Sequence, residues 1–140
     1  MRVIYAFVAG FIAVLVFHQG MLNILHESGF TPAVPFVLRP TEPFHVPVVW
    51  SLAFWGGVWG IVFVGFESIF PKGAGYWLWA IIFGAVALCL VAWFVVAPLK
   101  GIPMAAGWKP QAMATGLLVN GAWGLGCALF LRGFSGKRRG

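Results

Sequence analysis

The stretch VIYAFVAGFIAVLVFHQGMLNIL, which runs from Val3 to Leu25, decides the fold class. It is apolar over most of its length, and about 20 apolar residues in a helix suffice to cross a bilayer. Lipid offers the backbone no hydrogen-bond partners, so each span is expected to be a helix. The sequence predicts an all-α integral membrane protein: a single domain over residues 1–140, folded as an antiparallel four-helix transmembrane bundle. The expected spans are residues 3–25, 48–66, 76–97 and 111–131.

The composition supports this assignment. The chain is 61% hydrophobic and only 9% charged, whereas a soluble domain carries about 25% charged residues. The net charge of +6 comes from basic residues that are scattered singly, except in the C-terminal run Lys137–Arg139. That pattern argues against a nucleic-acid partner and favours contact between the tail and anionic lipid head groups. Cys89 and Cys127 lie inside spans, and we expect both to be small buried apolar residues.

The orientation follows from the distribution of lysine and arginine. Six of these residues flank the spans on the side of the two termini, and three flank them on the other side. Because cytoplasmic flanks are enriched in Lys and Arg, both termini are predicted to be cytoplasmic. The two proline-rich connections, residues 26–47 and 98–110, then lie outside. Glu67 ends the second span, and we expect it to form an interfacial ion pair with Lys72.

Polar side chains gather near the outer end of the first span. They are His18, Gln19, Asn23, His26 and Glu27. At 100° per residue these five fit within about half of the helix circumference. Ionisable groups at membrane depth are candidates for function. Asn120 is the other strongly polar side chain well inside a span, and it is expected to hydrogen-bond to a neighbouring helix. The predicted polar cluster is therefore His18, Gln19, Asn23, His26, Glu27 and Asn120.

A metal site is the alternative use of this region. His45 in the first outer connection, folded back towards His18, His26 and Glu27, would complete a zinc or copper set. The spacing of eight between His18 and His26 is not a metal-ligand signature, and no other span carries a histidine that would serve a haem. The sequence also lacks a nucleophile elbow, a Walker loop, CxxC and HExxH. It therefore predicts a protein without a cofactor and without enzymatic activity.

Small residues recur at a spacing of four, as lipid-embedded helices need for close approach. We expect them to serve packing within the chain rather than an oligomer interface. The run Gly57–Gly60 also resembles the run Gly121–Gly124, 64 residues later, which would fit a parallel repeat of two hairpins. In a chain with 19 Gly and 8 Trp, chance is the simpler explanation. The predicted packing residues are Gly56, Gly57, Gly60, Gly116, Gly121 and Gly124.

Three strings, FHQGMLNILHESG (17–29), PFHVPVVWSLAFWGGVWG (43–60) and NGAWGLG (120–126), cover much of the chain's distinctive sequence. On these strings the chain resembles a group of small four-span inner-membrane proteins of alphaproteobacteria and relatives. FHQ and SLAFWGGxWG are the most specific parts. The resemblance implies a four-span fold and a multi-pass location in the bacterial inner (plasma) membrane, and no catalytic role comes with it.

The sequence leaves three functions open. The favoured one is a non-catalytic accessory or scaffold subunit that packs against a larger membrane complex, with the lipid bilayer and a protein partner or a homo-oligomer as its surroundings. The alternative is a small oligomeric transporter or channel that uses the polar end of the first helix. The third is a metal or redox site at the outer face.

Overall fold

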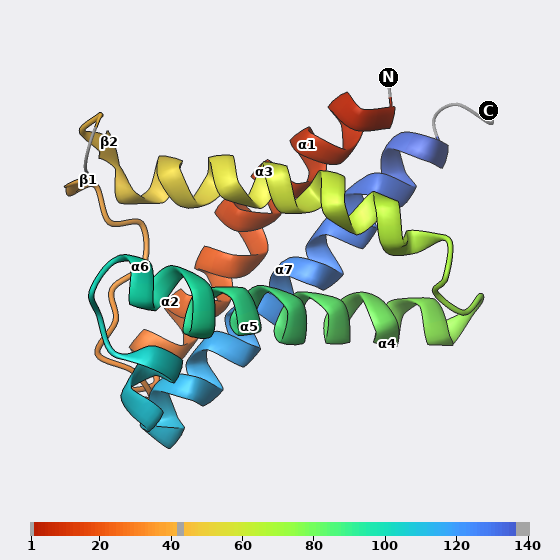
Figure 1. Ribbon diagram of the computed structural model, residues 1–140. Helices are drawn as coiled ribbons and strands as arrows, with labels where there is room; N and C mark the ends of the chain where they lie inside the picture. Colours follow the sequence, from red (N-terminus) through yellow and green to blue (C-terminus); the bar gives the residue numbers. More distant parts are fainter. Residues whose placement is uncertain (1, 42–43, 137–140) are drawn as a thin grey trace.

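The computed structural model describes residues 2–41 and 44–136, and the chain is mostly helical (Figure 1). Four long helices run through it, and all four are long and apolar enough to cross a membrane. The first is continuous from Arg2 to Glu27 and the third from Ala74 to Leu99. Each of these two contains π-helical turns. The helical segments are α1 (Arg2–Ala13), η1 (Val14–His18, π), α2 (Gln19–Glu27), α3 (Val48–Glu67), α4 (Ala74–Phe83), η2 (Gly84–Leu88, π), α5 (Cys89–Val91), η3 (Ala92–Val96, π), α6 (Ala97–Leu99) and α7 (Pro110–Gly136).

These boundaries contain the four predicted spans, each of which is extended by at most five residues at either end. Proline explains where the helices can begin, because it lacks the N–H that a helix interior needs. Pro110 is the first residue of α7, whereas Pro47 lies immediately before α3. The first two N–H groups of α3 bond instead to the preceding connection: Val48 N donates to Arg39 O and Val49 N to Val37 O, at 3.0 and 2.9 Å.

The two proline-rich connections contain little regular structure. Strands β1 (Pro40–Thr41) and β2 (Val46–Pro47) pair antiparallel in the first connection. The second contains the 3₁₀ segment η4 (Met104–Trp108), in which φ is positive from Ala105 to Trp108, so the chain turns with left-handed geometry. Both connections lie at one end of the bundle, which we call the loop end.

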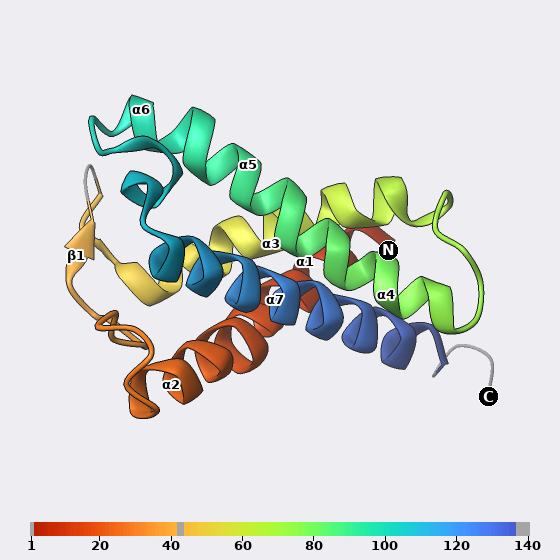
Figure 2. The same cartoon turned by 90° about the horizontal axis from the view of Figure 1, so that it is seen from below.

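The helices pack in a definite order. α1 packs against both α3 and α7, and α4 packs against the other side of α7. In Figure 1, α1 and α7 run diagonally past α3 and the α4–α6 helix, and Figure 2 shows α7 between the α1–α2 helix and the α4–α6 helix. The start of α1, the end of α7 and the α3–α4 connection lie together at the end opposite the loop end (Figure 1). We call this the termini end.

Two backbone-to-backbone crossings hold the bundle together. One lies in the first hairpin, formed by the α1–α2 helix and α3, and the other lies in the second hairpin, formed by the α4–α6 helix and α7. In the first hairpin, a Cβ on Gly10 would overlap Gly56 O, and a Cβ on Gly60 would overlap Ala6 O. In the second, a Cβ on Gly84 would overlap Asn120 O, and a Cβ on Gly124 would overlap Ala80 O. Without side chains between them, the backbones can approach closely, as small residues allow in lipid-embedded helices.

The matching contacts give a structural basis for the sequence echo. Gly60 and Gly124 are 64 residues apart, and each meets the carbonyl of an alanine on the preceding helix of its own hairpin. Gly56 and Asn120 are separated by the same 64 residues and occupy equivalent places in the two crossings. The two hairpins therefore repeat the same pattern of backbone contacts at these glycines.

The core lies where the hairpins meet. Trp123 of α7 is fully buried, and its Nε1 donates to Gly10 O at 3.1 Å, which joins the second hairpin to the first. Its ring meets that of Phe63 edge-on, with centroids 6.3 Å apart. Phe63 also contacts Phe83 of α4 at 5.5 Å. Cys89 and Cys127 are free, buried thiols, as the sequence predicts.

Candidate functional site

The structure divides the five polar residues of the first helix. Gln19 is buried with 2% of its surface exposed, whereas Asn23 and Glu27 are exposed. His18 and His26 are half-buried. Four of the five lie in the regular α-helix α2, after the π-helical turn at Val14–His18, so the turn does not separate them from one another. They differ in what covers them: the first connection folds over Gln19, whose Oε1 accepts the Phe36 N–H.

Gln19 anchors the first connection to the helix. Its Oε1 accepts the Phe36 N–H at 2.7 Å, and its Nε2 lies 2.9 Å from His18 Nδ1. Since Oε1 is the acceptor for Phe36, Nε2 is the donor to His18, and Nδ1 of that imidazole must be unprotonated. Phe36 has φ of 55°, an uncommon conformation for a residue with a side chain. Gln111 adds a second anchor by donating to Phe30 O at 2.6 Å.

The histidines are not brought together as a metal site. His45 is exposed in the turn between β1 and β2, with φ of 57°. Within residues 2–41 and 44–136, no group of three or more His, Cys, Asp or Glu side chains is placed to hold a metal ion. In the same part of the chain, His26 Nδ1 is buried without a hydrogen-bond partner.

Asn120 makes a contact between helices. Its Nδ2 donates to Cys89 Sγ of α5 at 3.2 Å. The side chain is half-buried and lies beside the second backbone crossing. Like Gln19, Asn120 forms its side-chain hydrogen bond within the chain.

The six glycines expected to serve packing all face other parts of the chain. Gly56 and Gly60 form the first crossing and Gly124 the second. A Cβ on Gly57 would meet the Phe7 ring at 2.6 Å, and one on Gly121 would lie 3.3 Å from Ile81 Cγ2. Gly116 has ordinary contact distances, with Cys89 Sγ 3.6 Å from its Cβ position.

A charged cluster at the termini end was not foreseen from the sequence. Glu67 Oε1 pairs with Arg2 at 3.3 Å, so the expected partner Lys72 is wrong, and Glu67 Oε2 accepts the Tyr76 hydroxyl at 2.9 Å. The Arg132 guanidinium lies over the Tyr76 ring, 4.1 Å from its centroid, and 5.3 Å from that of Trp77. The four long helices all contribute at their termini ends: α1 gives Arg2, α3 gives Glu67, α4 gives Tyr76 and Trp77, and α7 gives Arg132. The antiparallel order of the helices would have been enough to predict that these residues lie close together.

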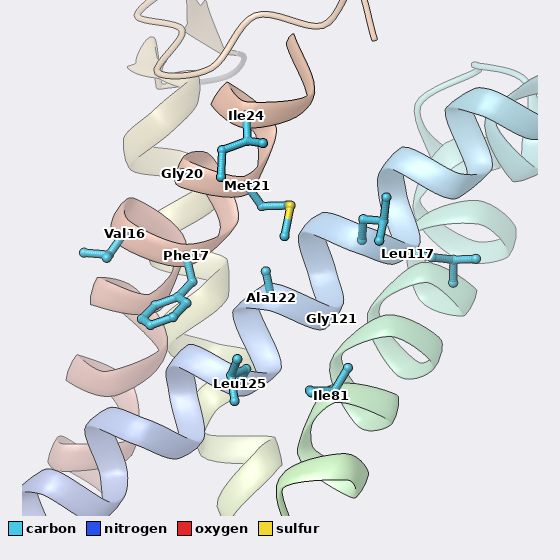
Figure 3. Close-up of a pocket in the computed structure, with 11 residues that line it drawn as sticks. Val16, Phe17, Gly20, Met21, Ile24, Ile81, Leu117, Gly121, Ala122 and Leu125 are labelled. Atoms are coloured by element: carbon cyan, nitrogen blue, oxygen red, sulfur yellow. The ribbon is translucent and has the colours of Figure 1, made fainter. Parts of the chain in front are cut away.

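An apolar groove of about 540 Å³ runs along α7. Figure 3 shows Met21 and Ile24 of α2 on one wall and Ile81 of α4 on the other, with Gly121 and Ala122 of α7 between them. A Cβ on Gly20, also in the lining, would meet nothing within 4 Å. The lining residues are Val16, Phe17, Gly20, Met21, Ile24, Ile81, Leu117, Leu118, Gly121, Ala122 and Leu125.

A second apolar surface lies on the α1–α3 side. Trp50, Phe54 and Trp55 of α3 are about half exposed, at 47, 50 and 57%. Two rings of α1 stand behind them: Phe11 stacks on Trp50 at 6.1 Å, and Phe7 meets Phe54 edge-on at 5.9 Å. We call Trp50, Phe54 and Trp55 the aromatic face.

No protein-family model matches the chain, and neither a curated protein nor a solved structure is detectably similar to it. Inference about function therefore starts from the geometry of these surfaces.

Proposed function

We propose that the chain is a non-catalytic integral membrane protein that acts as an accessory or scaffold subunit, packing against a larger membrane complex. The observation that carries this proposal is the aromatic face. We place the protein in a bacterial inner membrane, with both termini cytoplasmic. The orientation rests on Arg2, Lys72 and Arg132 at the termini end and on the basic residues 137–139 of the C-terminal tail.

The interior polar groups favour a structural role. Gln19 and Asn120 are bonded to partners within the chain. Lipid-embedded helices use such hydrogen bonds for association. A conducting path would need several polar groups left free to meet a solute. Among the buried polar side-chain atoms of residues 2–41 and 44–136, only His26 Nδ1 lacks a hydrogen-bond partner, so the geometry favours the structural role over transport.

The position of the aromatic face favours a protein partner. Trp55 is the eighth residue of α3, about 10 Å along the helix from its start. Tryptophan is enriched at membrane interfaces rather than within the spans, whereas large aromatic side chains dominate the energetics of protein interfaces. An exposed Trp and Phe at this depth are therefore better suited to a transmembrane helix of a partner than to lipid tails.

Co-purification tests the proposal. The tagged protein is extracted from native membranes in mild detergent and separated by native electrophoresis, and associated proteins are identified. Phe54→Leu with Trp55→Leu should weaken the association roughly tenfold, the size of effect that interface aromatics show. Phe94→Leu is the matched control, because Phe94 is 43% exposed in η3, away from the aromatic face.

Two results would reject the proposal. One is a wild-type protein that migrates alone, or only as copies of itself, in gently solubilised membranes. The other is equal loss of partner in the Phe94→Leu control. Orientation is tested separately: a thiol reagent that does not cross membranes should fail to label a Cys placed after Arg132 in intact cells.

A further inference from the structure

The groove along α7 points towards a cation at the termini end. Leu118, Leu125 and Arg132 are spaced by seven residues, and a helix drifts only about 20° over each heptad. The three therefore lie on one face of α7, and the two leucines line the groove. Leu129, which is 43% exposed, lies one turn from Arg132 and continues the apolar stripe between Leu125 and the arginine.

The α4 wall of the groove also leads towards the termini end. Ile81 lines the groove from α4, and Trp77 lies four residues earlier, one turn nearer the termini end. The Arg132 guanidinium lies 5.3 Å from the centre of the Trp77 ring. The apolar groove (Figure 3) is thus continued along α7 and along its α4 wall to Arg132, which lies over the rings of Tyr76 and Trp77.

From this continuity we propose that the groove and Arg132 bind one anionic phospholipid from the leaflet at the termini end. The guanidinium of Arg132 holds the phosphate, and one acyl chain lies in the groove over Leu129, Leu125 and Ala122. This site is separate from the aromatic face and does not depend on the proposed partner.

Charge complementarity selects the phosphate. In the part of the chain that the structure describes, no carboxylate pairs with Arg132. Glu67 pairs instead with Arg2 through Oε1, and its Oε2 accepts the Tyr76 hydroxyl. A guanidinium stacked on aromatic rings still presents a planar fork of N–H donors at its edge, which matches phosphate oxygens.

The dimensions select a lipid rather than a free anion. At 1.5 Å per residue, Leu125 lies about 10 Å along α7 from Arg132 and Ala122 about 15 Å. Half of a bilayer's hydrocarbon core is also about 15 Å. An acyl chain whose phosphate meets Arg132 would therefore end beside Ala122, within the groove.

Thermal unfolding of the delipidated protein in detergent tests the site. The buried thiols of Cys89 and Cys127 serve as reporters, because a thiol-reactive dye labels them only on unfolding. Phosphatidylglycerol, phosphatidylcholine with the same acyl chains and inorganic phosphate are titrated in parallel. For the wild type, phosphatidylglycerol should give a saturable stabilisation at the lowest concentration.

Five variants separate the parts of the site. Arg132→Gln should need roughly tenfold more phosphatidylglycerol for half of the effect, the least expected on losing a charge-assisted hydrogen bond. Arg132→Lys should keep the preference for the anionic lipid, with weaker binding. Leu125→Trp should also weaken binding, because it fills the groove. Lys109→Gln at the loop end and neutralisation of the three basic residues of 137–139 should leave binding unchanged.

The proposal is overturned if Arg132→Gln binds as the wild type does, or if phosphatidylcholine is as effective as phosphatidylglycerol. Equal stabilisation by inorganic phosphate would indicate an anion site without a chain. An unchanged Leu125→Trp variant would reject the groove, and loss of binding on neutralising the tail would transfer the headgroup to residues 137–139. Each of these results contradicts the assignment.

Discussion

The two helix crossings make a quantitative prediction about single methyl groups. A Cβ on Gly60 would overlap Ala6 O, and a Cβ on Gly124 would overlap Ala80 O. Both obstacles are backbone atoms, which cannot rotate away as a side chain can. The helices must separate instead. We therefore expect Gly60→Ala and Gly124→Ala each to lower the free energy of unfolding by about 1–3 kcal/mol, the usual cost of overpacking.

Two other glycines provide matched controls. Gly65 in α3 and Gly133 in α7 have nothing within 4 Å of their Cβ positions. Alanine costs less conformational entropy in a helix than glycine does, so Gly65→Ala and Gly133→Ala should be neutral or stabilise by up to about 1 kcal/mol. Each pair compares the same substitution on the same helix.

Reversible unfolding in mixed detergent micelles containing increasing dodecyl sulfate would measure these differences, with intrinsic tryptophan fluorescence as the signal. The decisive comparison is Gly60→Ala with Gly65→Ala, and Gly124→Ala with Gly133→Ala. If the members of each pair are equally stable, the helices do not cross at these glycines. A large loss in one hairpin alone would refute the equivalence of the two crossings.

Three smaller perturbations probe the polar contacts. Gln19→Leu leaves the Phe36 N–H without its acceptor and should cost about 1–3 kcal/mol, seen as faster protease cleavage of the first connection at unchanged cleavage of the second. Trp123→Phe removes the donor to Gly10 O and should cost about 1 kcal/mol or more in the same micelle unfolding assay; an unchanged midpoint would reject the bond. Glu67→Gln should cost less than about 1 kcal/mol, because its Arg2 partner is 68% exposed and exposed ion pairs contribute little, while the amide oxygen still accepts from Tyr76. Added salt should therefore narrow the difference in unfolding free energy between variant and wild type.

The four helices could be predicted because their signal is long and redundant. A span needs about 20 apolar residues, and no single residue decides it. The starts of the second and fourth helices followed from proline at 47 and 110. The glycines of the crossings were also visible in advance, since small residues at a spacing of four have few uses in lipid other than close packing.

The arrangement of the polar groups was less predictable, because their partners are distant in the sequence. Gln19 is buried by a connection that folds back to it, and only the tertiary structure reveals that Phe36 is its partner. The predicted partner of Glu67 was wrong because Lys72 is near it in the sequence, whereas Arg2 is 65 residues away but lies at the same end of the bundle.

Although the two crossings share their backbone contacts, the two hairpins differ in the side chains beside them. At equivalent positions, Gly56 has no side chain, whereas Asn120 extends to Cys89 Sγ. A side chain at Gly56 would overlap Val14 Cγ2 and stand 3.3 Å from Trp123 Nε1, so the first hairpin is closed by the tryptophan of the second. α1 and α7 therefore pack against each other, and the surface that each hairpin leaves exposed is its outer side. On the first hairpin that side is the aromatic face of α3, and on the second it is the α4–α7 wall that leads to Arg132.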